Sequence, residues 1–110
     1  MIDWARVADL RGEVGTEGFD EVVTMFMEET DETIRRLNGR REDAGLEELL
    51  HFLKGSALNL GFTTVSRLCQ EGERLAAAGR GSEVDLVQLT DSYLNTRHEF
   101  LLGLRQLPPI

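Results

Sequence analysis

Proline, the strongest helix breaker, is missing from most of the chain and occurs only near its C-terminus, as Pro108 and Pro109. Long hydrophobic runs are also missing: the longest apolar cluster, at residues 100–104, is far short of the ~20 residues that span a bilayer. The single cysteine, Cys69, cannot form an internal disulfide, and the amphipathic segment after Met1 contains no apolar stretch that resembles a secretory signal. These absences exclude a disulfide-stabilised secreted protein and a membrane-spanning protein, and we expect a cytoplasmic location without membrane binding.

Basic residues are scarce, since 12 Lys and Arg stand against 20 Asp and Glu, for a net charge of -8. Such a surface repels the phosphate backbone of nucleic acids, so we expect no nucleic-acid partner. The 110 residues suffice for a single domain over residues 1–110, with one core and no room for the deep cavity of a large enzyme. A hydrophobic content of 41% favours a packed globule over a disordered chain.

Glycines divide the chain into segments whose apolar residues recur at helical spacing, and no segment alternates with a period of two. The pattern predicts helices over residues 3–11, 17–38, 43–60, 63–79 and 85–106. Short connections between four long amphipathic helices are typical of helix bundles. We therefore expect an all-α fold: an antiparallel four-helix bundle with a short additional N-terminal helix, in which Cys69 is an inert buried thiol.

The third predicted helix carries chemistry on the side that faces away from its core stripe. The stripe consists of Leu46, Leu49, Leu50, Leu53, Ala57 and Leu60. At about 100° per residue, His51 lies about 140° from the centre of this stripe and should point to solvent. Lys54 and Leu58 lean to the same side as the histidine. The helix thus presents an imidazole, an ammonium group and an apolar side chain together.

Two details suggest that this face is more than solvated helix surface. Lys54 is the only lysine among the 12 basic residues, and Gly55 occupies a helix interior where glycine costs about 1 kcal/mol relative to alanine. A neutral imidazole is a competent nucleophile near pH 7 and can accept a phosphoryl group, whose charge a nearby ammonium would offset. The missing side chain at Gly55 would let the active site of another protein approach His51 closely.

The segment His51–Gly61, with the sequence HFLKGSALNLG, closely resembles the signature of histidine-containing phosphotransfer (HPt) domains of bacterial two-component phosphorelays. The resemblance implies that His51 is phosphorylated on the ring nitrogen distal to the backbone and that Lys54 stabilises the phosphoryl group. It also implies that Gly55 clears the approach of the partner and that Ser56 and Gly61 fill the remaining motif positions. Ser56 could equally be a structural residue that bonds back to its own helix.

One position departs from the family pattern. Some HPt domains carry a glutamine on the following helix that orients the phosphorylated imidazole. The corresponding position here holds Glu73, while Gln70 lies one turn earlier. A carboxylate at Glu73 could hold the proximal ring N–H of His51, but it would repel an added phosphoryl group that came too near. Glu73 could also be an ordinary residue of the helix surface.

The resemblance implies a phosphocarrier and not a kinase. His51 would take a phosphoryl group from an aspartyl phosphate on the receiver domain of a hybrid sensor kinase and pass it to the receiver of a response regulator. The receiver would bring the aspartate and Mg²⁺, so we expect no cofactor and no metal site on this chain. Gly55 and Leu58 would form an apolar patch that the receiver buries, and a monomer is expected.

Three other interpretations compete with the phosphocarrier. Glu48 and His51 form a Glu-x-x-His pair like those of di-iron bundles, but the other histidine, His98, has Asn95 three residues before it. A binding bundle that is never phosphorylated would leave His51 without a role. The dimerising domain of a histidine kinase would need a Gly-rich nucleotide box, which is missing.

Eight acidic residues and no basic one lie between Arg11 and Arg35. We expect this segment to be a solvated face that could also influence the choice of partner through charge complementarity.

Overall fold

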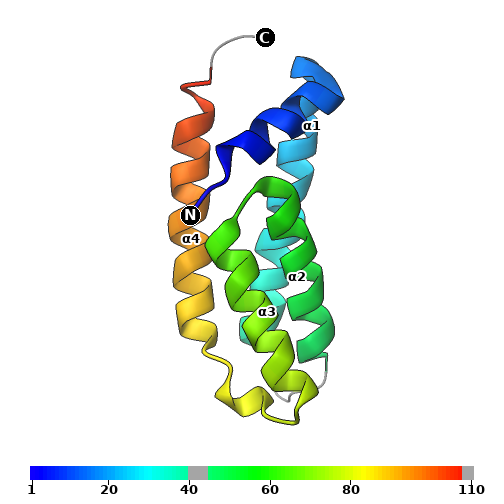
Figure 1. The fold of residues 1–110 in the computed structure, drawn as a ribbon, viewed down its shortest axis with the longest axis vertical. Coiled ribbons are helices and arrows are strands. Elements are labelled where there is room, and N and C mark those ends of the chain that lie inside the picture. The colour runs from blue at the N-terminus through cyan, green and yellow to red at the C-terminus, as the bar shows by residue number, and fades with distance from the viewer. Residues whose placement is uncertain (40–44, 108–110) are drawn as a thin grey trace.

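The fold is known from a computed structural model that describes residues 1–39 and 45–107. In these two ranges the chain is helical, without an extended strand, as the sequence predicts. The elements are α1 (Trp4–Gly39), α2 (Leu46–Leu60), α3 (Thr63–Ala77), a short 3-10 helix η1 (Gly81–Glu83) and α4 (Leu86–Leu104). The helices lie side by side along the long axis of an elongated molecule, 47 × 21 × 20 Å (Figure 1).

The first two predicted helices are continuous in the structure as the two arms of α1. They meet at Gly15, whose φ of 78° and ψ of 163° are not helical. A positive φ is accessible to glycine at little cost, so the chain turns sharply here without interrupting the helix on either side. The arm before Gly15 runs obliquely to the long axis (Figure 1). The predicted start of the third helix, at residue 43, lies outside the described residues, and α2 begins at Leu46.

Gly61 ends α2 and also fixes the N-terminus of the chain. Its φ of 76° lets its N–H reach back to the carbonyl oxygens of Ala57 and Leu58, as expected for a helix stop. Its own carbonyl accepts a 2.7 Å hydrogen bond from the N–H of Asp3. A Cβ on residue 61 would lie 2.6 Å from the backbone carbonyl oxygen of Asp3. Gly61 is therefore required both by its conformation and by the close approach of the N-terminal segment.

The core forms where the apolar faces of the helices meet. Leu50, Leu53 and Ala57 of α2 are fully buried, while Leu49 is only partly buried. Aromatic rings join the helices: the Phe62 and Phe100 rings lie edge to face, with centroids 5.1 Å apart. Burial of this apolar surface is the main force that assembles the helices.

A partly buried polar cluster joins α1 to α4 at the edge of this core. The Tyr93 hydroxyl donates a 2.6 Å hydrogen bond to Asp31 Oδ1 and lies 2.7 Å from the Thr30 hydroxyl. The Arg97 guanidinium donates to both oxygens of Asp31, at 3.0 and 3.1 Å. Asp31 belongs to the acidic run that we expected to be a solvated face, and for this residue the expectation is wrong. Its neighbours Arg97 and Tyr93 come from a helix more than 60 residues further along the chain.

Stability should fall at alkaline pH because two buried acids resist ionisation in the folded state. Burial, with a smaller contribution from the negative charge of Glu73, raises the pKa of Cys69 from its usual 9.0 to about 12. Burial and the hydrogen bond to Asp31 also raise the pKa of Tyr93. The folded state keeps these protons where the unfolded chain loses them, so full stability is retained only below about pH 9. Above it, we expect the free energy of unfolding to fall by up to about 1.4 kcal/mol per pH unit for each group.

Urea unfolding between pH 7 and pH 11 measures this dependence. The Cys69→Ala variant is the control, because it removes the thiol but leaves Tyr93 in place. Its stability should decline less steeply with pH than that of the wild type. Equal slopes for the two proteins would show that Cys69 is not the group responsible.

Candidate functional site

His51 lies in the middle of α2, on the side opposite the buried stripe, and its side chain is 72% exposed. The helical periodicity predicts this orientation. Because α2 packs against both α1 and α3 through its inner face, the core fixes the position of the helix that carries the imidazole. The imidazole is therefore presented to solvent on a helix that is held by the core.

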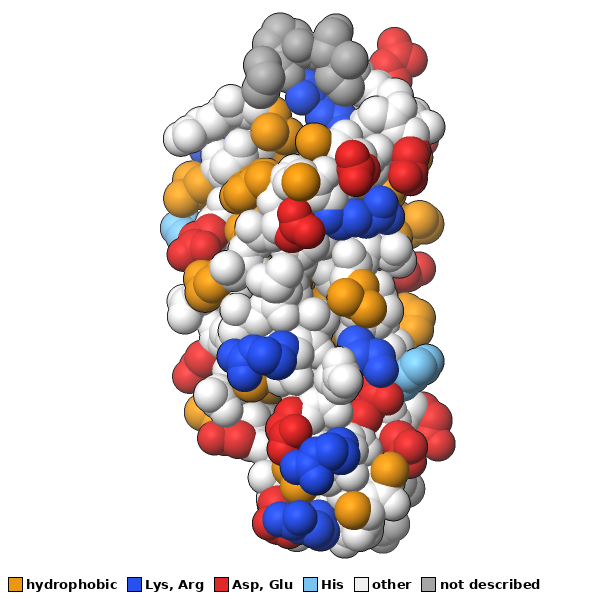
Figure 2. Space-filling model, viewed as in Figure 1, with side chains coloured by type: hydrophobic (Ala, Val, Ile, Leu, Met, Phe, Trp, Pro, Cys, Tyr) orange, Lys and Arg blue, Asp and Glu red, His pale blue; other side chains and the backbone are white. Residues whose placement is uncertain are grey.

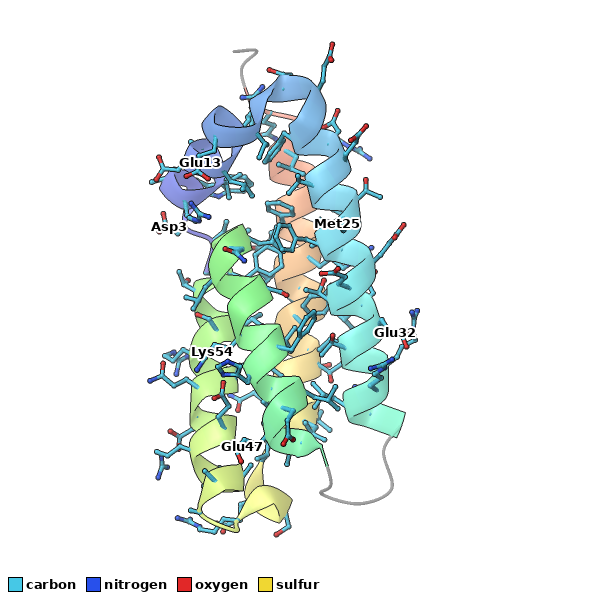
Figure 3. All side chains as sticks on the ribbon, turned by 90° about the vertical axis from the view of Figure 1, so that its right-hand side faces the viewer. Asp3, Glu13, Met25, Glu32, Glu47 and Lys54 are labelled. Atoms are coloured by element: carbon cyan, nitrogen blue, oxygen red, sulfur yellow. The ribbon has the colours of Figure 1, made fainter. Side chains whose placement is uncertain are left out.

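Glu73, on α3, joins His51 to Lys54. Its side chain is only 17% exposed, with Oε2 3.3 Å from His51 Nδ1 and Oε1 2.9 Å from Lys54 Nζ. The Lys54 side chain lies where α2 and α3 face each other (Figure 3). The alternative that Glu73 is an ordinary surface residue is wrong, and the structure brings Glu73, not the exposed Gln70, to the imidazole.

The contact with Glu73 favours one tautomer of a neutral His51. A carboxylate can accept a hydrogen bond but cannot donate one, so this contact is a hydrogen bond when a neutral His51 carries its proton on Nδ1. The lone pair then resides on Nε2, which is the exposed nitrogen. The arrangement presents a nucleophilic nitrogen to an incoming electrophile and holds the opposite side of the ring in place.

The ion pair between Lys54 and Glu73 is close but poorly aligned. Oε1 of Glu73 is buried and accepts no hydrogen bond from any residue in the described part of the chain, although the ammonium nitrogen is only 2.9 Å away. Attraction between the Lys54 ammonium group and the Glu73 carboxylate keeps Lys54 in this position. The flexible ammonium group can therefore turn toward an anion that arrives beside His51.

The close packing of α2 against α3 depends on Gly72, which the sequence analysis did not single out. A Cβ on Gly72 would lie 2.9 Å from Leu50 Cδ1 and 3.3 Å from Val84 Cγ1. The absence of a side chain lets the two helices approach closely enough for Glu73, the next residue, to reach His51. A glycine in a helix interior costs about 1 kcal/mol relative to alanine. This cost is the feature of the sequence that could have identified Gly72 as a close contact between helices.

The other predicted site residues lie on two sides of α2. Gly55 is exposed, and a Cβ on it would meet nothing within 4 Å, so the fold itself does not require glycine there. Leu58, one turn further along the same side, is 56% exposed. Ser56 instead faces inward and is buried, and Gly61 lies at the end of the helix, away from the imidazole.

The sequence analysis also missed an open groove between α1 and α2. It has a volume of about 470 Å³, and the exposed ring of Phe52, the residue after His51, lies at its edge. Part of the acidic run borders it, together with a carboxylate from α2: Glu28, Glu29, Glu32 and Glu48. An acidic border around an apolar surface favours partners of complementary charge.

The Hpt domain family profile matches residues 21–107 of the chain, which include all the residues of this site. The chain belongs to the Hpt domain family. It is similar to the phosphorelay intermediate protein YPD1 of Candida albicans, with 33% identity over 96 residues that cover 83% of the chain and 50% of the relative. The chain thus spans about half the length of this relative. No solved structure gives a significant match.

Within residues 1–39 and 45–107, no group of three His, Cys, Asp or Glu side chains could hold a metal ion. Glu48 and His51 therefore belong to no such group. Among the described helices, none is long and apolar enough to cross a membrane.

Proposed function

We propose that this chain is a phosphocarrier of a two-component phosphorelay, in which His51 accepts a phosphoryl group from the aspartyl phosphate of one receiver domain and relays it to another. The observation that carries the proposal is the exposed imidazole whose Nδ1 contacts Glu73, while Nε2 has no partner among residues 1–39 and 45–107. The name of the relative, a phosphorelay intermediate, supports the same role. We infer that the phosphorelay is bacterial because the motif HFLKGSALNLG resembles that of bacterial HPt domains.

The transfer step follows from the tautomer of His51. The Nε2 lone pair attacks the phosphorus atom, an N–P bond forms, and the P–O bond to the aspartate of the receiver breaks, so that the aspartate leaves as a carboxylate. The ring keeps its proton on Nδ1 and becomes positively charged. The Glu73 carboxylate, 3.3 Å from Nδ1, stabilises this charge, and Lys54 turns toward the new phosphoryl oxygens.

The remaining parts of the proposal concern the chain as a whole. It forms a single domain over residues 1–110, an antiparallel four-helix bundle with the arm before Gly15 as its short additional helix; the backbone at Gly15 and the tight turn at Gly61 support this architecture. It has no autokinase activity and no cofactor, and the receiver supplies Mg²⁺. Its partners are the receivers of a hybrid sensor kinase and of response regulators, which it meets in the cytoplasm. The chain carries out each transfer as a monomer.

Phosphotransfer profiling against the receiver domains of the source organism tests this function. Each receiver is phosphorylated with a radiolabelled donor and mixed with the chain, and the label is followed on a gel. Acid-labile, base-stable label on the chain is the expected result, as for a phosphoramidate. A chain that takes label from no receiver would instead be the binding bundle that is never phosphorylated.

Lys54→Ala should slow phosphoryl transfer about tenfold while His51 remains modifiable. The lysine offsets charge on the phosphoryl oxygens but provides none of the bonding atoms, and water at the open site weakens its effect below that of a buried donor. Rapid-quench transfer from a labelled receiver gives the rate constant.

Glu73→Gln is the matched control for the lysine variant. It releases Lys54 from its ion pair but keeps a side-chain oxygen that can accept from Nδ1–H. Transfer to this variant should be much faster than transfer to Lys54→Ala. If the two variants are equally slow, the negative charge of Glu73 contributes as much to the transfer step as the positive charge of Lys54.

Leu58→Glu should weaken receiver binding and transfer together, without unfolding the helices. Leu58 is an exposed apolar side chain on the same side of α2 as His51, and a central apolar contact carries much of the energy in small transient interfaces. Titration calorimetry and transfer kinetics measure the two effects. A melting temperature many degrees lower, with unchanged transfer, would assign Leu58 to the core and not to docking.

A further inference from the structure

The outer face of α4 is apolar, although the inner face of the same helix already packs into the core. Leu89, Tyr93, Thr96 and Phe100 are buried, whereas Val87, Leu94 and Leu102 are 71%, 52% and 46% exposed. At about 100° per residue, the three exposed side chains lie on the side of α4 opposite the buried ones. Nothing in the packing of the molecule accounts for apolar residues at these positions.

Three charged or titratable side chains share this outer face. Asp91 lies in the N-terminal half of α4, His98 in its C-terminal half, and Arg105 at its C-terminal end. None of these side chains forms an ion pair or a hydrogen bond with another residue of the described ranges. These three side chains are therefore available to pair with a partner of complementary charge.

The spacing of these residues makes the face complementary to itself. Leu94 and Leu102 lie four residues before and after His98, and Asp91 and Arg105 lie seven residues before and after it. Two copies of α4 placed antiparallel, with a two-fold axis at His98, would bring each Asp91 opposite Arg105 and each Leu94 opposite Leu102. A parallel arrangement would instead place like charges together.

We propose that the outer face of α4 binds a second copy of this chain and forms a weak antiparallel dimer around His98. The paired stretch, residues 91–105, is about 21 Å of helix, so the interface falls below the standard size for stable complexes. Dilute protein is therefore monomeric, as the sequence predicts, and the dimer forms at high concentration. The negative charge of the chain disfavours the other obvious occupant of an apolar helix face, an anionic membrane.

The proposed dimer leaves the His51 site open. The two histidine side chains, pale blue in Figure 2, lie at opposite edges of the molecule, and the one at the α4 edge has hydrophobic side chains beside it. α4 packs against α3 and α1, on the other side of the molecule from the exposed surface of α2 (Figure 1). Two copies joined through α4 would each present a complete phosphoryl-accepting site to a receiver.

Sedimentation equilibrium between about 10 µM and about 1 mM tests the dimer. The weight-average mass should rise from 12.4 kDa toward twice that value as the concentration increases. Leu94→Asp should abolish the increase. Val87→Asp is the matched control, because Val87 is even more exposed but lies outside the paired stretch, and it should leave the increase in place.

Charge exchange tests the antiparallel register. Asp91→Arg alone and Arg105→Asp alone should each weaken association about tenfold, and the double variant, which restores the opposite pairing, should recover it. A constant mass of 12.4 kDa at about 1 mM would overturn the proposal, as would a double variant no better than the single ones. Phosphoryl uptake by His51 should be the same in all these variants, so this result is independent of the phosphocarrier proposal.

Discussion

His51→Ala is expected to abolish phosphoryl uptake completely and to leave the fold intact. The imidazole provides the attacking nitrogen, and no other side chain in the described site offers an exposed neutral nucleophile of this kind. The side chain is largely exposed, so its loss should change the free energy of unfolding by no more than about 0.5 kcal/mol. Transfer of radiolabel from a phosphorylated receiver and thermal unfolding followed by circular dichroism measure the two quantities.

His98→Ala is the matched control, since His98 is the other histidine of the chain and lies on α4. It should take up label at the wild-type rate. Label on the His51→Ala variant, or loss of uptake in the His98→Ala variant, would show that the site has been placed on the wrong helix.

Gly55→Gln is expected to reduce transfer about 100-fold while uptake chemistry at His51 stays intact. The side chain would stand one turn from the imidazole and hold the aspartate of the receiver away, and a displacement of about 1 Å from the reacting geometry costs roughly that factor. The variant should fold normally, because a Cβ at this position has open space around it. Transfer from a receiver, compared with uptake from a small phosphodonor such as phosphoramidate, separates docking from chemistry.

Gly55→Ala controls for the loss of glycine itself. Alanine has the higher helix propensity, so this variant should be more stable by about 0.5–1 kcal/mol, and its small side chain should slow transfer far less than glutamine. Gly61→Ala provides the contrast, because there the Cβ would meet the backbone of Asp3 and the variant should be less stable. Rapid transfer to the Gly55→Gln variant would mean that the partner does not approach over Gly55.

Helix periodicity predicted most of the buried face of α2 and its exposed face, although Leu49, placed on the core stripe, is only partly buried. The positions of Leu50, Leu53 and Ala57 follow from spacing within one helix, and so do the exposures of His51 and Leu58. A residue's direction around a helix depends only on its neighbours within a few turns, so it can be read locally. The motif from His51 to Gly61 is likewise contiguous in the chain, which is why its resemblance to the Hpt family is visible in the sequence alone.

Contacts between helices could not be predicted in this way. The sequence analysis left open whether Glu73 touches His51, because the answer depends on how closely α3 approaches α2, and Gly72 sets that distance. Asp31 was expected to be solvated because its neighbours in the sequence are acidic, yet Tyr93 and Arg97 surround it. In both cases the decisive partner lies 22 or more residues away.

The sequence by itself therefore determined the helical class of this protein, the outward direction of His51 and the family motif, since each depends on short-range spacing. Tertiary structure alone decided that Glu73 holds the proximal nitrogen of His51 and pairs with Lys54. It also decided that the N-terminal segment is fixed against Gly61. The physical reason is that these contacts arise from the packing of separate helices, whose relative depth and rotation are set by the whole core and not by any one segment.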